Sequence, residues 1–140
     1  MMQMFPLLAI SLIAYAILTL AGVAGPEDVI WHQQLIVGLP LPSGDTWGLR
    51  GGDFFLVASV GFLFVELIRA TRTDASSITN HIFSIILAVI CVLAFILVKG
   101  FGNSTFFIYM SMTFLDALAG MVVTTTTARR DLNVTEGLRA

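Results

Sequence analysis

The sequence carries little charge, one cysteine and two histidines, and each shortage excludes a class of protein. Charged residues make up 11% of the 140 residues, whereas soluble domains contain about 25%. Because Cys91 stands alone, the chain has no intramolecular disulfide and no paired-cysteine redox site. No basic patch, phosphate loop, dinucleotide fingerprint or Ser-His-Asp arrangement is evident. We therefore expect no enzyme, no nucleic-acid binding, no cofactor and no metal.

Long apolar runs dominate what the sequence does contain. Apolar residues make up 57% of the chain, and the mean hydropathy is +0.93. Four apolar stretches occupy residues 5–24, 54–68, 82–98 and 106–128. About 20 apolar residues in an α-helix cross the hydrocarbon core of a bilayer. We therefore predict a single-domain, all-α membrane protein, an antiparallel bundle of four transmembrane helices at about 5–24, 53–72, 80–99 and 104–128.

The distribution of lysine and arginine predicts the orientation, because basic residues concentrate in cytoplasmic loops. Only Arg50 and Lys99 fall on one side of the predicted helices. The other side holds Arg69, Arg72, Arg129, Arg130 and Arg139. We therefore expect a multi-pass protein of the bacterial inner membrane, with the tail 129–140 and both termini in the cytoplasm.

The first apolar stretch also admits a second interpretation. Residues 22–24 form a small-x-small sequence, as at a signal-peptide cleavage site. The stretch lacks a basic n-region and exceeds the usual length of a signal-peptide core. These two features favour a retained helix.

The outer loop, residues 25–52, predicts two local structures. Pro26 followed by two acidic residues is typical of a helix start, so a short surface helix is expected through about residue 35. Apolar runs at 36–41 and 46–49 flank a Pro-Ser-Gly-Asp turn, which predicts a hairpin-like loop. Both tryptophans of the chain are expected as interfacial anchors: Trp31 and Trp47.

A carboxylate lies in the middle of the fourth apolar stretch, where a charge is costly. Asp116 is about 18 Å from the expected helix start at Ser104, and a charge at that depth costs roughly 2.5–3.5 kcal/mol. Counting from the predicted helix ends places one polar side chain of each helix at a similar depth. We predict that these side chains form one polar layer: Ser11, Glu66, Ser84 and Asp116.

Polar and small residues also recur in steps of three and four on two helices. The stripe on the fourth helix consists of Tyr109, Thr113, Asp116, Gly120, Thr124 and Thr127. The stripe on the second consists of Ser59, Phe62, Glu66, Arg69 and Thr73. Such stripes are typical of close helix packing in lipid. Glu66 is interpreted as forming an ion pair with Arg69. Asp116 is a packing residue held by hydrogen bonds or a proton, an ion or proton site, or a contact between subunits.

Four local patterns make the chain similar to a known group of proteins. They are Leu39-Pro40-Leu41-Pro42-Ser43-Gly44 with Trp47 and Gly52-Asp53; Glu66 with Arg69-Ala70-Thr71-Arg72-Thr73; Ser104-Thr105-Phe106; and Asp116 and Gly120 with Thr127-Ala128-Arg129-Arg130-Asp131-Leu132. Over nearly its whole length the chain resembles a group of small, functionally uncharacterised bacterial four-helix inner-membrane proteins. The resemblance implies the fold and the compartment, and implies no activity.

Three functions stay open on the sequence. The leading hypothesis is a non-catalytic accessory or assembly subunit that packs against itself or other membrane proteins through the stripes and the outer loop. The alternative is a small homo-oligomeric transporter or a proton or ion conductor that uses Asp116 with Glu66. A weaker alternative is quinone or lipid binding by the 11 phenylalanines.

Overall fold

Four helices and a two-stranded hairpin make up the structure, a computed structural model that describes residues 6–22, 29–70 and 75–137. For residues 75–78, 124 and 127–137 it describes the backbone alone. The helices are α1 (Leu7–Leu20), α2 (Gly51–Ala70), α3 (Ala75–Leu97) and α4 (Ser104–Gly137). The prediction of a mostly helical chain with four helices is confirmed.

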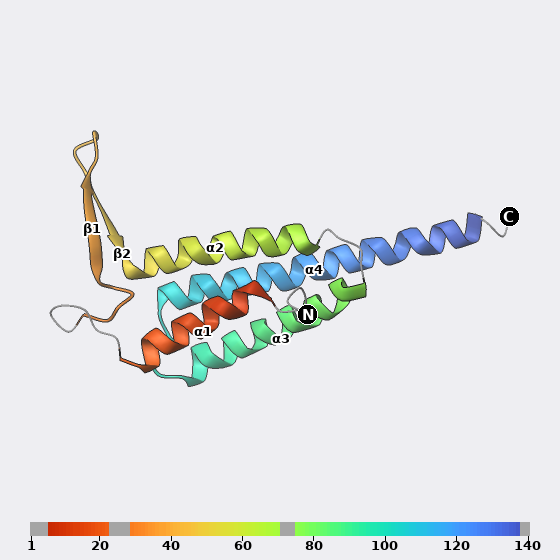
Figure 1. Cartoon of the computed structure of the whole chain (residues 1–140), viewed down its shortest axis with the longest axis horizontal. Helices are drawn as coiled ribbons and strands as arrows, with labels where there is room; N and C mark the ends of the chain where they lie inside the picture. The colour runs from red at the N-terminus through yellow and green to blue at the C-terminus, as the bar shows by residue number, and fades with distance from the viewer. Residues whose placement is uncertain (1–5, 23–28, 71–74, 138–140) are drawn as a thin grey trace.

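Three of the helices are long and apolar enough to cross a membrane: α2, α3 over residues 79–97 and α4 over residues 104–123. The 14 residues of α1 extend over about 21 Å, which is less than the roughly 30 Å of a hydrocarbon core. The predicted ends of this helix, at residues 5, 23 and 24, lie outside the described residues. Helix α4 has 34 residues, continues past its expected end at 128, and projects beyond the other helices (Figure 1).

The helices run beside one another in alternating directions (Figure 1). Helix α4 packs against both α2 and α3, and α1 packs against α2. The side chains that face away from the bundle are largely apolar, as expected for surfaces that contact lipid. Examples from each helix are Ile17, Val57, Phe64, Ile96, Leu97 and Val122.

An aromatic cluster forms the core at the hairpin end of the bundle. Tyr15 is fully buried at its centre. Its ring centroid lies between 4.8 and 5.2 Å from those of four neighbours: Trp31, Phe55, Phe101 and Phe106. Asn103 Nδ2 donates to the Tyr15 hydroxyl at 2.7 Å. The cluster therefore joins α1, α2, α4 and the loops before β1 and α4.

The predicted hairpin is confirmed as β1 (Leu35–Pro40) paired antiparallel with β2 (Thr46–Arg50). Gly44 adopts a φ of 91° in the connecting turn, a conformation that glycine accepts without steric cost. The hairpin runs crosswise to the helices and extends away from the bundle (Figure 1). Only its base contacts α2.

The prediction of a surface helix between residues 26 and 35 is wrong for the part that the structure describes, because residues 29–34 form a turn. Two hydrogen bonds to α2 and the burial of one aromatic ring hold this turn. Gly51 N and Gly52 N, at the start of α2, donate to the carbonyls of Gln34 and His32, both at 3.0 Å. The indole of Trp31 enters the aromatic core.

Side chains cap the starts of α2 and α4. Asp53 is the third residue of α2 and reaches back to accept from Arg50 N at 2.8 Å, the carboxylate half of a capping box. Asn103 caps α4, since Phe106 N donates to its Oδ1 at 3.1 Å. Helix α3 begins at Ala75, five residues before the start expected at about 80.

Candidate functional site

The four residues of the predicted polar layer are all buried: Ser11, Glu66, Ser84 and Asp116. They come from four different helices. Their pairing divides them, however, into two neighbouring groups. Glu66, Ser84 and Asp116 lie together, whereas Ser11 pairs elsewhere.

Glu66 lies at the N-terminus of α1. Leu8 N, one of the amides that a helix start leaves without an internal partner, donates to Glu66 Oε2 at 3.2 Å. Pro6, at the N-cap of α1, supplies no side-chain cap. A carboxylate from α2 therefore caps α1 and faces the positive end of its dipole.

The same turn of α1 is held from α4. The Tyr109 hydroxyl donates to the Leu8 carbonyl at 2.6 Å. Both side chains that hold this turn, Glu66 and Tyr109, are buried. Part of the polar layer is thus used to fix α1 against the other helices.

Ser11 pairs with α2 away from the carboxyl groups. Its Oγ lies 3.1 Å from Ser59 Oγ, and the Ser59 hydroxyl also lies 2.9 Å from the Phe55 carbonyl. Ser59 lies about two helical turns before Glu66 on α2. This contact is therefore separate from the carboxyl pair.

Asp116 faces α3 and α2. It lies close enough to His81 and Glu66 to interact electrostatically with both. Ser84 approaches it, but neither Ser84 Oγ nor Asp116 Oδ2 completes a hydrogen bond of good geometry among the described residues. Thr113, one turn before Asp116 on the same stripe, donates to Met110 O of its own helix at 2.7 Å.

Gly120 lets α3 approach this site closely. A Cβ at position 120 would overlap the ring of His81. The imidazole therefore packs directly on the α4 backbone, one turn after Asp116. This contact gives the small residue of the predicted stripe a physical reason.

The stripe on α4 faces inward along its described part, because Tyr109, Thr113, Asp116 and Gly120 are all buried. The side chains of Thr124 and Thr127 lie outside the described residues. On α2, Ser59 and Glu66 are buried, whereas Arg69 is exposed. Within the described chain no ion pair joins Arg69 to Glu66, so the expected pair is not formed and Arg69 acts at longer range.

The two tryptophans occupy different environments. Trp31, expected as an interfacial anchor, is buried, and its Nε1 donates to Thr19 Oγ1 at 3.2 Å. Its ring fills the aromatic core because the turn at 29–34 points it inward. Trp47 is 51% exposed on the hairpin.

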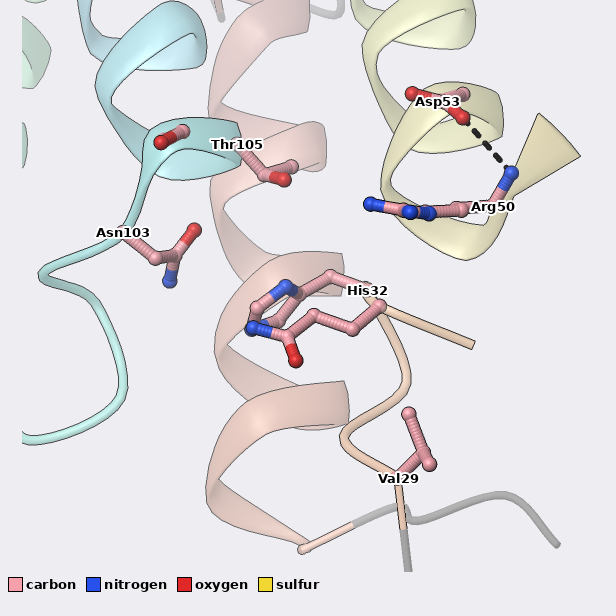
Figure 2. Close-up of a pocket in the computed structure, with 8 residues that line it drawn as sticks. Val29, His32, Arg50, Asp53, Asn103 and Thr105 are labelled. Atoms are coloured by element: carbon pink, nitrogen blue, oxygen red, sulfur yellow. Dashed lines mark hydrogen bonds between the residues drawn. The ribbon is translucent and has the colours of Figure 1, made fainter. Parts of the chain in front are cut away.

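A polar pocket that the sequence did not predict lies at the hairpin end of the bundle. The cavity measures about 470 Å³. Arg50 and Asp53 line one side, Asn103 and Thr105 line the other, and His32 lies between them (Figure 2). Asp53 and Asn103 each cap a helix start, and the packing of α2 beside α4 brings the two helix starts together.

Burial lowers the pKa of His32 from its usual 6.5. The folded protein therefore disfavours the imidazolium, so His32 stabilises the fold fully above about pH 6.5. This contribution is lost as the pH falls from there through the lowered pKa. We expect the unfolding midpoint in detergent to fall between pH 7.5 and pH 5 less steeply for His32→Gln than for the wild type. Parallel curves for the two proteins would contradict this expectation.

Comparison with protein-family models, curated proteins and solved structures finds no match for the chain. The resemblance to small bacterial four-helix membrane proteins therefore stays a prediction.

Proposed function

We propose that this chain is a non-catalytic accessory subunit of the bacterial inner membrane that binds another membrane protein through its hairpin. All four helices lie in the bilayer, with both termini in the cytoplasm. The end of α2 and the projecting part of α4 lie at one end of the bundle, and the hairpin lies at the other (Figure 1). Most of the basic residues belong to the first of these ends, which supports a cytoplasmic assignment for it.

The observation that carries this proposal is the apolar face of the hairpin. Residues paired across an antiparallel ladder point to the same face, and two apolar pairs share one face: Val37 with Leu49 and Leu39 with Trp47. The opposite face carries Gly38 with Gly48 and Pro40 with Thr46. We call residues 35–50 the hairpin arm and the first of these surfaces its apolar face.

Few contacts with the rest of the molecule cover the hairpin arm. Val37, Leu39 and Trp47 are all more than a third exposed. An isolated two-stranded hairpin is marginally stable in water, and its only charged strand residue is Arg50. Charges that protect strand edges from pairing are therefore scarce. A surface of this kind is stabilised by a partner.

The direction of the arm favours a partner beside the bundle. With the helices across the bilayer, the arm extends sideways at the outer membrane surface (Figure 1). Its longer strand has six residues and reaches about 20 Å, roughly two helix diameters. The arm therefore lies over a neighbouring transmembrane bundle, where apolar side chains from that bundle's outer loops cover the apolar face.

Adjacent residues on opposite faces of β2 provide a matched test. We expect Trp47→Asp to weaken binding of the partner at least about tenfold, because buried aromatic anchors contribute about 2 kcal/mol or more to an interface. Thr46→Asp places the same charge on the other face and is expected to change affinity less than about threefold. The partner is identified by copurification in mild detergent, and affinities are then measured with the two purified proteins.

Three results would contradict the proposal. Equal affinities for the two variants would exclude docking through the apolar face. Recovery of the intact chain as a homodimer alone would make the partner a second copy. If Trp47 is protected from a water-soluble quencher in nanodiscs that contain this chain and no partner protein, the apolar face contacts lipid instead.

A further inference from the structure

Three buried oxygen atoms from three helices lack a hydrogen-bond partner within the described chain: Glu66 Oε1, Ser84 Oγ and Asp116 Oδ2. Their side chains are 1%, 1% and 3% exposed, respectively. Leaving a buried polar group unpaired costs about 1–3 kcal/mol, and more when the group is charged. Unpaired polar atoms on three neighbouring buried side chains are typical of a site that binds a cation, a proton or a hydrogen-bond donor.

The chemistry of these groups favours a ligand that is positive or is a hydrogen-bond donor. Glu66 and Asp116 interact electrostatically, and two carboxylates in an apolar interior repel each other. A proton on either carboxyl group removes one negative charge and turns an acceptor oxygen into a donor. One bound proton therefore relieves both the repulsion and the shortage of donors.

We propose that Glu66 and Asp116 form an intramembrane proton-binding site in which the electrostatically coupled pair retains one exchangeable proton on one or the other carboxyl group. The proton comes from water and resides on Glu66 Oε1 or Asp116 Oδ2, the two oxygens without partners. Ser84 lies beside Asp116 and supplies a hydroxyl to the same site. This site goes beyond the proposed docking function, which depends on the hairpin arm.

The surrounding groups allow the pair to keep one negative charge. From α1, Leu8 N–H faces Glu66 Oε2. From α3, the buried Asn80 side chain approaches Glu66, and His81 faces Asp116. On α2, Arg69 acts on Glu66 from an exposed position. From α4, the Tyr109 hydroxyl is already committed to Leu8 O. These donors offset one carboxylate, and the retained proton neutralises the other.

The composition of the site favours a proton over a divalent metal. Across the described residues, no group of three or more His, Cys, Asp and Glu side chains is arranged to hold a metal ion. Proton binding is also linked to the position of α1. A protonated Glu66 is a weaker acceptor for Leu8 N–H than a carboxylate is, so the proton loosens the cap of α1.

Infrared spectroscopy of the full chain in nanodiscs tests the site directly. At neutral pH we expect one protonated-carboxyl C=O band that shifts in D2O. Because the repulsion between the two carboxylates retains the proton, Glu66→Gln and Asp116→Asn should each abolish the band, since the remaining carboxylate no longer faces a second negative charge. Asp53→Asn, at the solvent-facing start of α2, is the matched control and should keep it.

Carbodiimide labelling gives a second readout that needs no variant. A hydrophobic carbodiimide reacts with protonated carboxyl groups within lipid, so folded wild type should gain one adduct per chain, located by mass spectrometry at position 66 or 116. This readout decides the outcome if the Glu66 variant fails to fold by circular dichroism.

Three outcomes would overturn the proposal. The first is a folded wild type with neither the band nor an adduct at neutral pH. The second is a band that survives one of the two single substitutions, which would assign the proton to the other residue alone. The third is loss of the band on adding sodium at constant pH, which would make the site a sodium site.

Discussion

Replacing Tyr15 with alanine should destabilise the folded protein by about 3–5 kcal/mol, the range for deleting a buried aromatic side chain. Tyr15 is fully buried and contacts four aromatic rings. Surrounding rings of this size collapse poorly into the space that is left, so the cavity cost is expected to be high. Unfolding in mixed micelles of increasing SDS content, followed by circular dichroism, measures the loss.

Tyr15→Phe is the matched control for this experiment. It keeps the ring and removes the hydroxyl that accepts from Asn103 Nδ2, so a loss of about 0.5–1.5 kcal/mol is expected. Equal losses for the two variants would show that the hydrogen bond, rather than ring packing, holds this end of the bundle. A loss below about 1 kcal/mol for alanine would contradict the assignment of Tyr15 to the core.

Gly51→Ala should also destabilise the folded protein. A Cβ at position 51 would overlap the backbone carbonyl oxygen of Trp31, and a backbone atom has no alternative rotamer. The turn at 29–34 must therefore move away from the start of α2. We expect a loss of about 1–3 kcal/mol or more, together with weaker burial of Trp31, measured by SDS titration and by quenching of tryptophan fluorescence.

Gly61→Ala provides the comparison within the same helix. No atom lies within 4 Å of a Cβ at this position, and a helical Ala is favoured over Gly by up to about 1 kcal/mol. Position 61 should therefore tolerate alanine with no loss of stability. If Gly51→Ala were as stable as Gly61→Ala, the close approach of the 29–34 turn to α2 would be contradicted.

The helices were predictable because their signal is local. Apolar runs of suitable length placed all four helices, and the Pro-Ser-Gly-Asp turn between two apolar runs placed the hairpin. The prediction of a surface helix from residue 26 was wrong because it rested only on a local helix-start pattern, Pro26 followed by two acidic residues. Hydrogen bonds to α2 and burial of Trp31 hold residues 29–34 in a turn instead.

The sequence indicated which residues face the interior at the candidate site. It did not indicate which of these residues contact one another. Steps of three and four residues placed Tyr109, Asp116 and Gly120 on one inward face. Residue counting also brought Glu66 to the depth of Asp116. Counting did not show that Glu66 caps α1, because a helix rotation or a shift of one turn is invisible along a single sequence.

By itself the sequence determined the membrane class, the four helices, the hairpin and the presence of two costly carboxyl groups. These follow from hydrophobicity and local backbone preference, which each segment carries with it. Only the tertiary structure decided that Glu66 caps α1 and interacts electrostatically with Asp116, that Trp31 turns inward, and that the apolar face of the hairpin lies open. Those outcomes depend on how helices rotate and slide against one another, since a hydrogen bond or a ring contact needs its partner within a few ångströms.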